Sequence, residues 1–116
     1  MSFEQYELPE GKIMIAFSDK NLSVGTLDIN PGQELPKHNR PVVESLFQVR
    51  GKCVIKVFED DGRVKDVLLD EGDSIDISPL KYHVHSNPFD EVSTTFWRAN
   101  GDITEIIGKV RENSKM

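Results

Sequence analysis

Two segments of the chain hold all three of its histidines. Residues 32–51 are GQELPKHNRPVVESLFQVRG, and residues 72–87 are GDSIDISPLKYHVHSN. In the second segment His83 and His85 are two residues apart, so on a β-strand their imidazole rings project from one face. In the first segment His38 and Glu44 also have an even spacing, but Pro41 between them is typical of a strand edge or a bend. Since imidazole and carboxylate are common ligands of divalent metals, the two segments together predict a metal or ligand site.

The remaining sequence is typical of an all-β domain. Val and Ile together account for 20 of the 116 residues, whereas Ala and Leu together account for 10. β-branched side chains favour the pleated surface of a sheet, while Ala and Leu favour helices. Turn signals recur at short intervals, which is typical of a β-sandwich or a small barrel. We expect strands at about residues 13–17, 22–29, 34–39, 44–50, 52–58, 63–69, 73–77, 82–87, 92–99 and 102–107.

Turn residues and strand parity add detail to this prediction. Asp60-Asp61-Gly62 and Asn100-Gly101 are each expected to close a hairpin between the strands that flank them, because such residues tolerate the positive φ angles of tight turns. In the strand at 52–58, Lys52 and Lys56 face water, which turns Cys53 and its alternate neighbours inward. We therefore expect Cys53 to be a small core residue.

Composition limits the classes of partner. The chain has 14 Lys and Arg against 20 Asp and Glu, a net charge of −6, and its basic residues are scattered. Since phosphate backbones are bound by positive patches, no nucleic acid is expected as a partner. The longest apolar run, Ile13–Phe17, is far shorter than the roughly 20 residues of a membrane helix, so no membrane partner is expected either. The lack of a recognisable secretory signal and the single Cys53 predict a cytoplasmic protein.

The two histidine segments resemble the two motifs of the cupin superfamily. The first cupin motif is G-x5-H-x-H-x3–4-E-x6-G. This chain matches it at Gly32, His38, Glu44 and Gly51, and it has Arg40 where the second histidine is usual.

The second cupin motif is G-x5-P-x-G-x2-H-x3-N. This chain matches it at Gly72, His83 and Asn87, with Ser78 and Leu80 at the usual Pro and Gly positions. The resemblance covers about residues 22–100 and includes a hairpin between the two motifs, as in small single-domain cupins.

The resemblance implies a fold and an assembly. The expected fold is all-β, a double-stranded β-helix or jelly-roll barrel with a site inside it. We expect residues 1–116 to form a single cupin domain, with a motif-bearing core at about 22–107 and a polar tail at 108–116. A homodimer is expected from the resemblance alone.

The resemblance also implies a metal site. Carried over by position, His38, Glu44 and His83 would ligate a divalent transition metal such as Fe, Mn, Ni or Zn. Arg40 cannot be a ligand, because a guanidinium stays protonated and has no lone pair. Three arrangements stay open at this point: the three residues alone with free coordination positions, His85 as a fourth ligand, or no metal and a carboxylate or phosphate clamped by Arg40.

Three hypotheses about function follow. In the first, the chain binds the metal and acts on or recognises a small anionic metabolite, with a metal-dependent dioxygenase or isomerase among the possible activities. In the second, it is a metal-free ligand-binding or structural cupin in which Arg40 holds an anion. In the third, it is a metal-independent sugar isomerase or epimerase with a histidine base. Arg40, Gln48 and His85 are expected to line the ligand pocket, and no catalytic residue is assigned.

Overall fold

The computed structural model describes residues 3–113 of the chain. These residues form nine strands and one helix. The strands are β1 (Glu4–Leu8), β2 (Gly11–Ser18), β3 (Ser23–Ile29), β4 (Val43–Arg50), β5 (Cys53–Phe58), β6 (Val64–Leu69), β7 (Ser74–Ile77), β8 (His83–Ser86) and β9 (Ser93–Asn100), and the helix is α1 (Thr104–Asn113). No helix in this part of the chain is long and apolar enough to cross a membrane.

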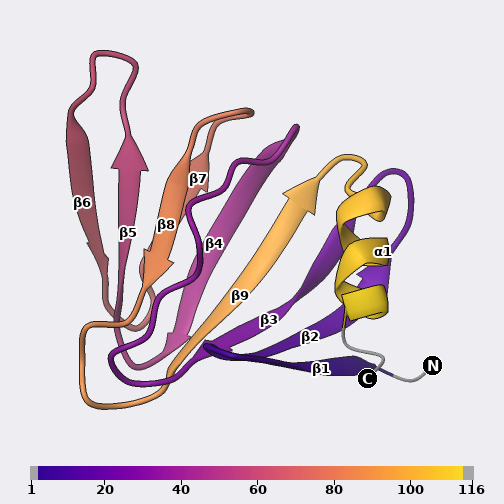
Figure 1. Cartoon of the computed structure of the whole chain (residues 1–116), viewed down its shortest axis with the longest axis horizontal. Helices are drawn as coiled ribbons and strands as arrows, with labels where there is room; N and C mark the ends of the chain where they lie inside the picture. The colour runs from indigo at the N-terminus through magenta and orange to yellow at the C-terminus, as the bar shows by residue number, and fades with distance from the viewer. Residues whose placement is uncertain (1–2, 114–116) are drawn as a thin grey trace.

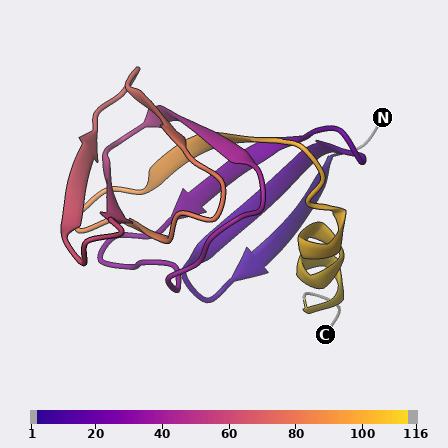
Figure 2. The same ribbon diagram turned by 90° about the horizontal axis from the view of Figure 1, so that it is seen from above.

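The strands form two antiparallel sheets. The larger has the order β1-β2-β3-β9-β4-β7, and the smaller has the order β6-β5-β8. The smaller sheet stands opposite the β4 and β7 side of the larger one, while β1, β2 and β3 extend away from it toward α1 (Figure 1). Seen from above, α1 again lies at the end of the molecule opposite β6 (Figure 2). The predicted all-β jelly-roll architecture is confirmed.

The core lies between the facing sheets. Leu46 of β4 and Ile29 of β3 point inward from the larger sheet, and Cys53 and Ile55 of β5 point inward from the smaller one. All four are at most 2% exposed. The alternation predicted for the strand at 52–58 is therefore correct, and so is the hairpin at Asp60-Asp61-Gly62, which joins β5 to β6. Burial of these apolar side chains is the main source of stability of such a fold.

The strand predicted at residues 34–39 is wrong. The long connection between β3 and β4 passes along β8 and makes only two isolated bridges, Glu34 to Ser86 and His38 to His83. Pro36 lies between the bridges, and it has no N–H group with which to continue a ladder. The connection is thus fixed to β8 at separate points, and one of these points holds two of the predicted metal ligands.

The strand predicted at residues 102–107, with its hairpin at Asn100-Gly101, is also wrong, because helix α1 follows β9. The Asp102 carboxylate caps the helix by accepting hydrogen bonds from the Thr104 N–H (2.9 Å) and hydroxyl (2.7 Å). The apolar residues after this cap, Ile103, Ile106, Ile107 and Val110, have the spacing of one helix face. The predicted boundary between core and polar tail at 107/108 falls inside this helix.

Strand β1 was not expected from the sequence, because only Tyr6 and Leu8 in it are apolar. It pairs with β2 at the edge of the larger sheet. Its Glu4 carboxylate accepts two hydrogen bonds from the Arg111 guanidinium of α1, both 2.7 Å long. This two-pronged ion pair ties α1 to the sheet edge.

The ion pair leads to a prediction about proton binding. Hydrogen bonds from Arg111 and then Tyr6 lower the pKa of Glu4 from 4.5 to about 2. The stabilisation from this group is present above the unfolded pKa of 4.5 and is lost as the pH falls toward 2. We expect an NMR titration of the Glu4 carboxyl to give a midpoint near 2 in the wild type and a higher midpoint in Arg111→Met, still below 4.5 because the Tyr6 hydrogen bond remains. Lys109→Met, on the same helix, is the control and should leave the midpoint unchanged. An unchanged midpoint in Arg111→Met would contradict the ion pair between Glu4 and Arg111.

Candidate metal centre

Two histidines of the site are held opposite each other by backbone pairing. The His38 N–H donates to the His83 carbonyl (3.0 Å), and the His83 N–H donates to the His38 carbonyl (2.9 Å). In an antiparallel bridge, residues that face each other project their side chains to the same side. The ring centroids accordingly lie 4.3 Å apart. The bridge therefore brings His38, from a loop, beside His83 of β8.

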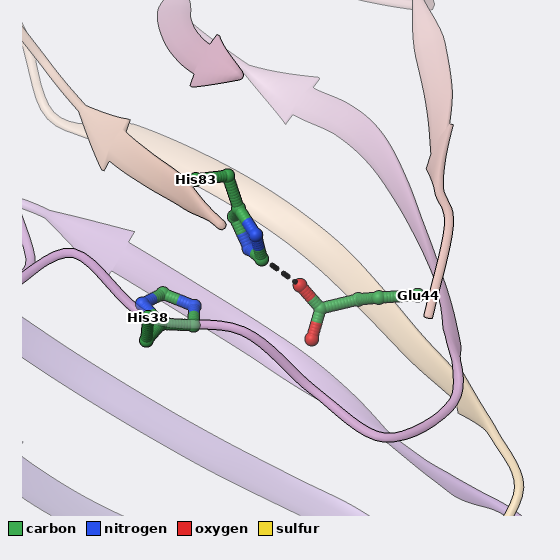
Figure 3. A group of neighbouring side chains, drawn as sticks. All are labelled: His38, Glu44 and His83. Atoms are coloured by element: carbon green, nitrogen blue, oxygen red, sulfur yellow. Dashed lines mark ion pairs between the residues drawn. The ribbon is translucent and has the colours of Figure 1, made fainter. Parts of the chain in front are cut away.

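The carboxylate of the site comes from the other sheet. Glu44 lies near the start of β4 and points between the sheets toward the two imidazoles (Figure 3). Its Oε1 lies 3.3 Å from His83 Nε2. One possible ligand atom from each of His38, Glu44 and His83 lies within 4.8 Å of the others. The structure thus brings together the three residues that the cupin resemblance implied as ligands.

The protonation of both imidazoles is set by neighbouring carbonyl groups. His38 Nδ1 lies 2.8 Å from the Pro36 carbonyl oxygen, and His83 Nδ1 lies 3.2 Å from the Lys81 carbonyl oxygen. A carbonyl only accepts, so each Nδ1 carries a proton. In His38 the lone pair is then on Nε2, whereas His83 Nε2 lies against a Glu44 carboxylate oxygen, to which it can only donate a proton that a bound metal would displace. Such outer hydrogen bonds orient histidine ligands in metal sites.

Burial and nearby charges determine the protonation of His38 and Glu44. Burial, helped by the positive charge of Arg40, lowers the pKa of His38 from 6.5 to about 4. Burial by itself raises the pKa of Glu44, but the His83 hydrogen bond and the Arg40 charge outweigh it, and the net direction is downward. At neutral pH the site therefore holds a neutral His38 and an ionised Glu44.

Arg40 lies at the edge of the same group. Its Nε is 4.0 Å from Glu44 Oε2, and its Nη1 donates a 3.2 Å hydrogen bond to the Asn39 carbonyl. Within the described residues, no other hydrogen bond of the guanidinium is present. The remaining N–H groups are available to a carboxylate or phosphate ligand.

His85 and Gln48 belong to a buried chain of hydrogen bonds. Gln48 Nε2 donates to the Arg50 carbonyl (2.9 Å), which identifies Oε1 as its acceptor atom. Thr95 Oγ1 donates to that Oε1 (2.7 Å), so its contact of 3.2 Å with His85 Nε2 is one in which the imidazole donates. His85 Nε2 is therefore occupied by Thr95, and His85 is not among the residues whose possible ligand atoms converge. This arrangement supports His85 as a wall residue rather than a fourth ligand.

Gln48, predicted as a pocket residue, is placed in the core. Its amide also donates to Ser93 Oγ (2.9 Å), and its Oε1 accepts from the Cys53 thiol (3.2 Å). All of its hydrogen-bonding capacity is used inside the protein, because four partners surround it. Burial raises the pKa of Cys53 to about 11, so this thiol stays protonated and unreactive.

A cavity of about 330 Å³ opens onto the site. His38, Arg40, Glu44 and His85 contribute to its polar lining. Its apolar lining includes Ile103, which directly precedes α1, and three residues of α1, none of them predicted as functional: Ile106, Ile107 and Val110. The i, i+3, i+4, i+7 spacing of these residues is the signal that could have identified them, together with the Asp102-x-x-Glu105 pattern of a helix start.

Comparison with known proteins identifies the fold. No protein-family model and no curated protein matches the sequence. Among solved structures, oxalate decarboxylase of Bacillus subtilis is 25% identical with a TM-score of 0.77, and the match covers 85% of this chain and 28% of the decarboxylase chain. The chain has the cupin fold.

Two further structures share this cupin fold. An oxalate oxidase is 16% identical with a TM-score of 0.66, over 70% of this chain and 42% of the oxidase chain. A Streptococcus pyogenes protein of unknown function is 15% identical with a TM-score of 0.65, over 75% of this chain and 70% of that one. This cupin therefore spans less than half of either oxalate enzyme.

The backbone conformation explains why glycine occurs at the glycine positions of the cupin motifs. Gly32, Gly51 and Gly72 all have positive φ angles, between 68° and 91°. Leu80, at the motif's fourth glycine position, also has a positive φ, 65°, although it has a Cβ atom. Its backbone N–H donates to the Arg40 carbonyl (2.7 Å), so this left-handed turn holds the segment that carries Arg40. The backbone at this position therefore has the left-handed conformation, although the chain has leucine there in place of the glycine that adopts it most easily.

The turn at Leu80 gives a stability prediction. Leu80 is 66% exposed, so replacing it with glycine removes backbone strain and little packing. We expect Leu80→Gly to raise the free energy of unfolding by about 1 kcal/mol in urea denaturation. As a control, Leu68→Gly, at an exposed position in strand β6, should lower it by about 1 kcal/mol. A loss of stability in Leu80→Gly would show that the leucine side chain matters more than its φ angle.

Proposed function

We propose that this cupin binds a divalent transition metal through His38, Glu44 and His83 and recognises a small anionic ligand through Arg40 beside it. The observation that carries the proposal is the convergence of the three ligand atoms within 4.8 Å, with both Nδ1 atoms bonded to carbonyls. Residues from a loop, β4 and β8 meet at this point, so the convergence is a property of the fold.

The donor set fits such a metal. Two neutral imidazoles and one carboxylate suit iron and also tolerate Mn, Ni or Zn, and they leave coordination positions for a ligand. One of the oxalate decarboxylase structures is described with Mn(II) centres, which supports Mn as the first metal to test. When bound, a divalent metal supplies Lewis-acid polarisation of a ligand oxygen.

The protein's own residues explain the preference for an anion. A divalent metal at this position carries +2, Glu44 contributes −1 and Arg40 contributes +1, so the site has a net positive charge. Burial strengthens the interaction of these charges with an incoming anion. The unpartnered N–H groups of Arg40 orient a carboxylate by paired hydrogen bonds, and the walls of the cavity limit its contact with water.

The contacts favour this role over a metal-independent isomerase with a histidine base. His83 has both ring nitrogens engaged, Nδ1 at the Lys81 carbonyl and Nε2 at Glu44. His38 has a free Nε2, but its pKa of about 4 makes it a weak base at neutral pH. A neutral His38 imidazole with its lone pair on Nε2 is better suited to binding a metal.

Metal content tests the proposal directly. We expect near-stoichiometric metal, measured by elemental mass spectrometry on protein purified without an affinity tag and reloaded with Mn(II), and its loss in His83→Ala. Bound metal stabilises the native state, so a chelator should lower the melting temperature of the wild type.

His85→Ala is the matched control for this experiment. It removes a second buried histidine from β8, two residues along the strand, but this histidine lies outside the converging group. Metal should therefore be retained in His85→Ala. Metal absent from the reloaded wild type, or present equally in all three proteins, would refute the metal site.

A second experiment tests the anion clamp. Arg40→Met keeps much of the side-chain length and removes the charge, so acetate binding measured by calorimetry should weaken at least tenfold, because hydrogen bonds between charged groups contribute about 1.5–3 kcal/mol. Metal content should not change. Arg50→Met, at the exposed end of β4, is the control with the same chemical change. Equal acetate affinity in the wild type and Arg40→Met would remove Arg40 from the ligand site.

A further inference from the structure

The cavity beside the metal centre has two chemically different parts. The polar lining groups lie close together, since Arg40 is 4.0 Å from Glu44 and Glu44 converges with His38. Most of the remaining wall is hydrocarbon. It includes Leu27, Leu46 and Trp97 from the larger sheet and Ile106, Ile107 and Val110 from α1.

The helix wall is firmly held in place. Ile107 is 2% exposed and packs into the core, and Arg111, one turn further on, is tied to Glu4 of β1 by two hydrogen bonds. The apolar face of α1 is therefore a fixed side of the cavity. Arg40 and this apolar face line the same cavity.

This lining does not suit a small dianion. If one carboxylate of oxalate met Arg40 and the metal ligands, the second would lose water at a mainly hydrocarbon wall, and an unpaired charge is costly to bury there. Glu10, the other charged lining residue, is negative and would repel it. An apolar group in the same place would gain from burial.

We propose that the ligand of this cupin is an amphipathic monocarboxylate, whose carboxylate faces Arg40 and whose hydrocarbon tail lies against α1. This proposal rests on the proposed function for its polar end and adds the chemical class of the ligand. The cavity of about 330 Å³ is at the small end of ligand pockets. At about 30 Å³ for each small group, it takes a ligand of roughly ten non-hydrogen atoms. A carboxylate with a tail of five to eight carbons fits this volume.

A series of straight-chain acids tests the tail. Calorimetry on the full chain, loaded with Mn(II) and with its metal content measured in the same preparation, would compare butanoate, hexanoate and octanoate. Each buried methylene should strengthen binding about fourfold, so Kd should fall about sixteenfold at each step until the cavity is full. Oxalate and the uncharged 1-hexanol should both bind more weakly than hexanoate.

A variant of the cavity wall locates the tail. Val110→Asn puts a polar amide into the helix wall and should weaken octanoate binding about tenfold or more while leaving butanoate binding within twofold. Lys109→Asn makes the same new side chain at the neighbouring exposed position, outside the cavity, and should change neither. Circular dichroism of the two variants checks that both remain folded.

The outcomes separate this proposal from the one on which it rests. Equal affinities for the three acids, or tighter binding of oxalate than of hexanoate, would overturn the amphipathic ligand and leave the metal centre in place. Binding of 1-hexanol as tight as that of hexanoate would also overturn it. Tail-length dependence in protein that takes up no metal would support the ligand class and refute the metal site.

Discussion

The pair of backbone hydrogen bonds between His38 and His83 is the constraint on which the site depends. It attaches a loop broken by Pro36 to strand β8 and sets two imidazoles side by side. β8 is in turn registered on β5, where His83 pairs with Val57, so the position of both rings follows from the smaller sheet. Glu44 is registered independently in the larger sheet, opposite Ala99 and Ile77. The site therefore forms only when both sheets have these registers, because a one-residue slip of β8 or β4 would turn its ligand residues to the other face of the sheet.

Placing polar groups between two apolar sheet faces is costly, and the structure shows how the cost is met. Burial opposes the charged form of Glu44, but His83 and Arg40 lie close enough to keep its pKa low. The amide of Gln48 has four partners, which include Ser93, Thr95 and Cys53. The two groups differ in how many hydrogen-bond donors and acceptors they leave without a partner. The Gln48 chain is closed on itself and stabilises the core. Around Glu44, by contrast, the Nε2 of His38 and several N–H groups of Arg40 have no hydrogen-bond partner within residues 3–113, which suits this group to a ligand.

Some of these features could be predicted from the sequence because they depend on local spacing. The burial of Cys53 and the shared face of His83 and His85 follow from strand alternation, and Glu44 follows from its distance to His38 in the cupin motif. Gln48 has the same even spacing, yet it lies in the core, since face alone does not say how far along the barrel a residue sits. The segment at residues 102–107 is predicted as a strand because its three Ile side chains favour a β-structure locally. The Asp102 cap and the packing of Ile107 outweigh that propensity.

The shared fold and the proposed ligand preference depend on different parts of this chain. The elements that bring His38, Glu44 and His83 together are the sheets that this chain shares with the oxalate enzymes. The wall that a ligand tail would touch comes partly from the larger sheet and partly from α1, which lies after the second cupin motif. A substitution of an α1 residue that lines the cavity would change its apolar surface. It would leave unchanged the strand pairing that positions His38, Glu44 and His83. The fold therefore does not determine the function, which depends on the residues that line the site. For this chain, the cavity wall is mainly apolar and the proposed metal would make the centre positive, and these two properties are the basis for proposing a ligand with one charged end.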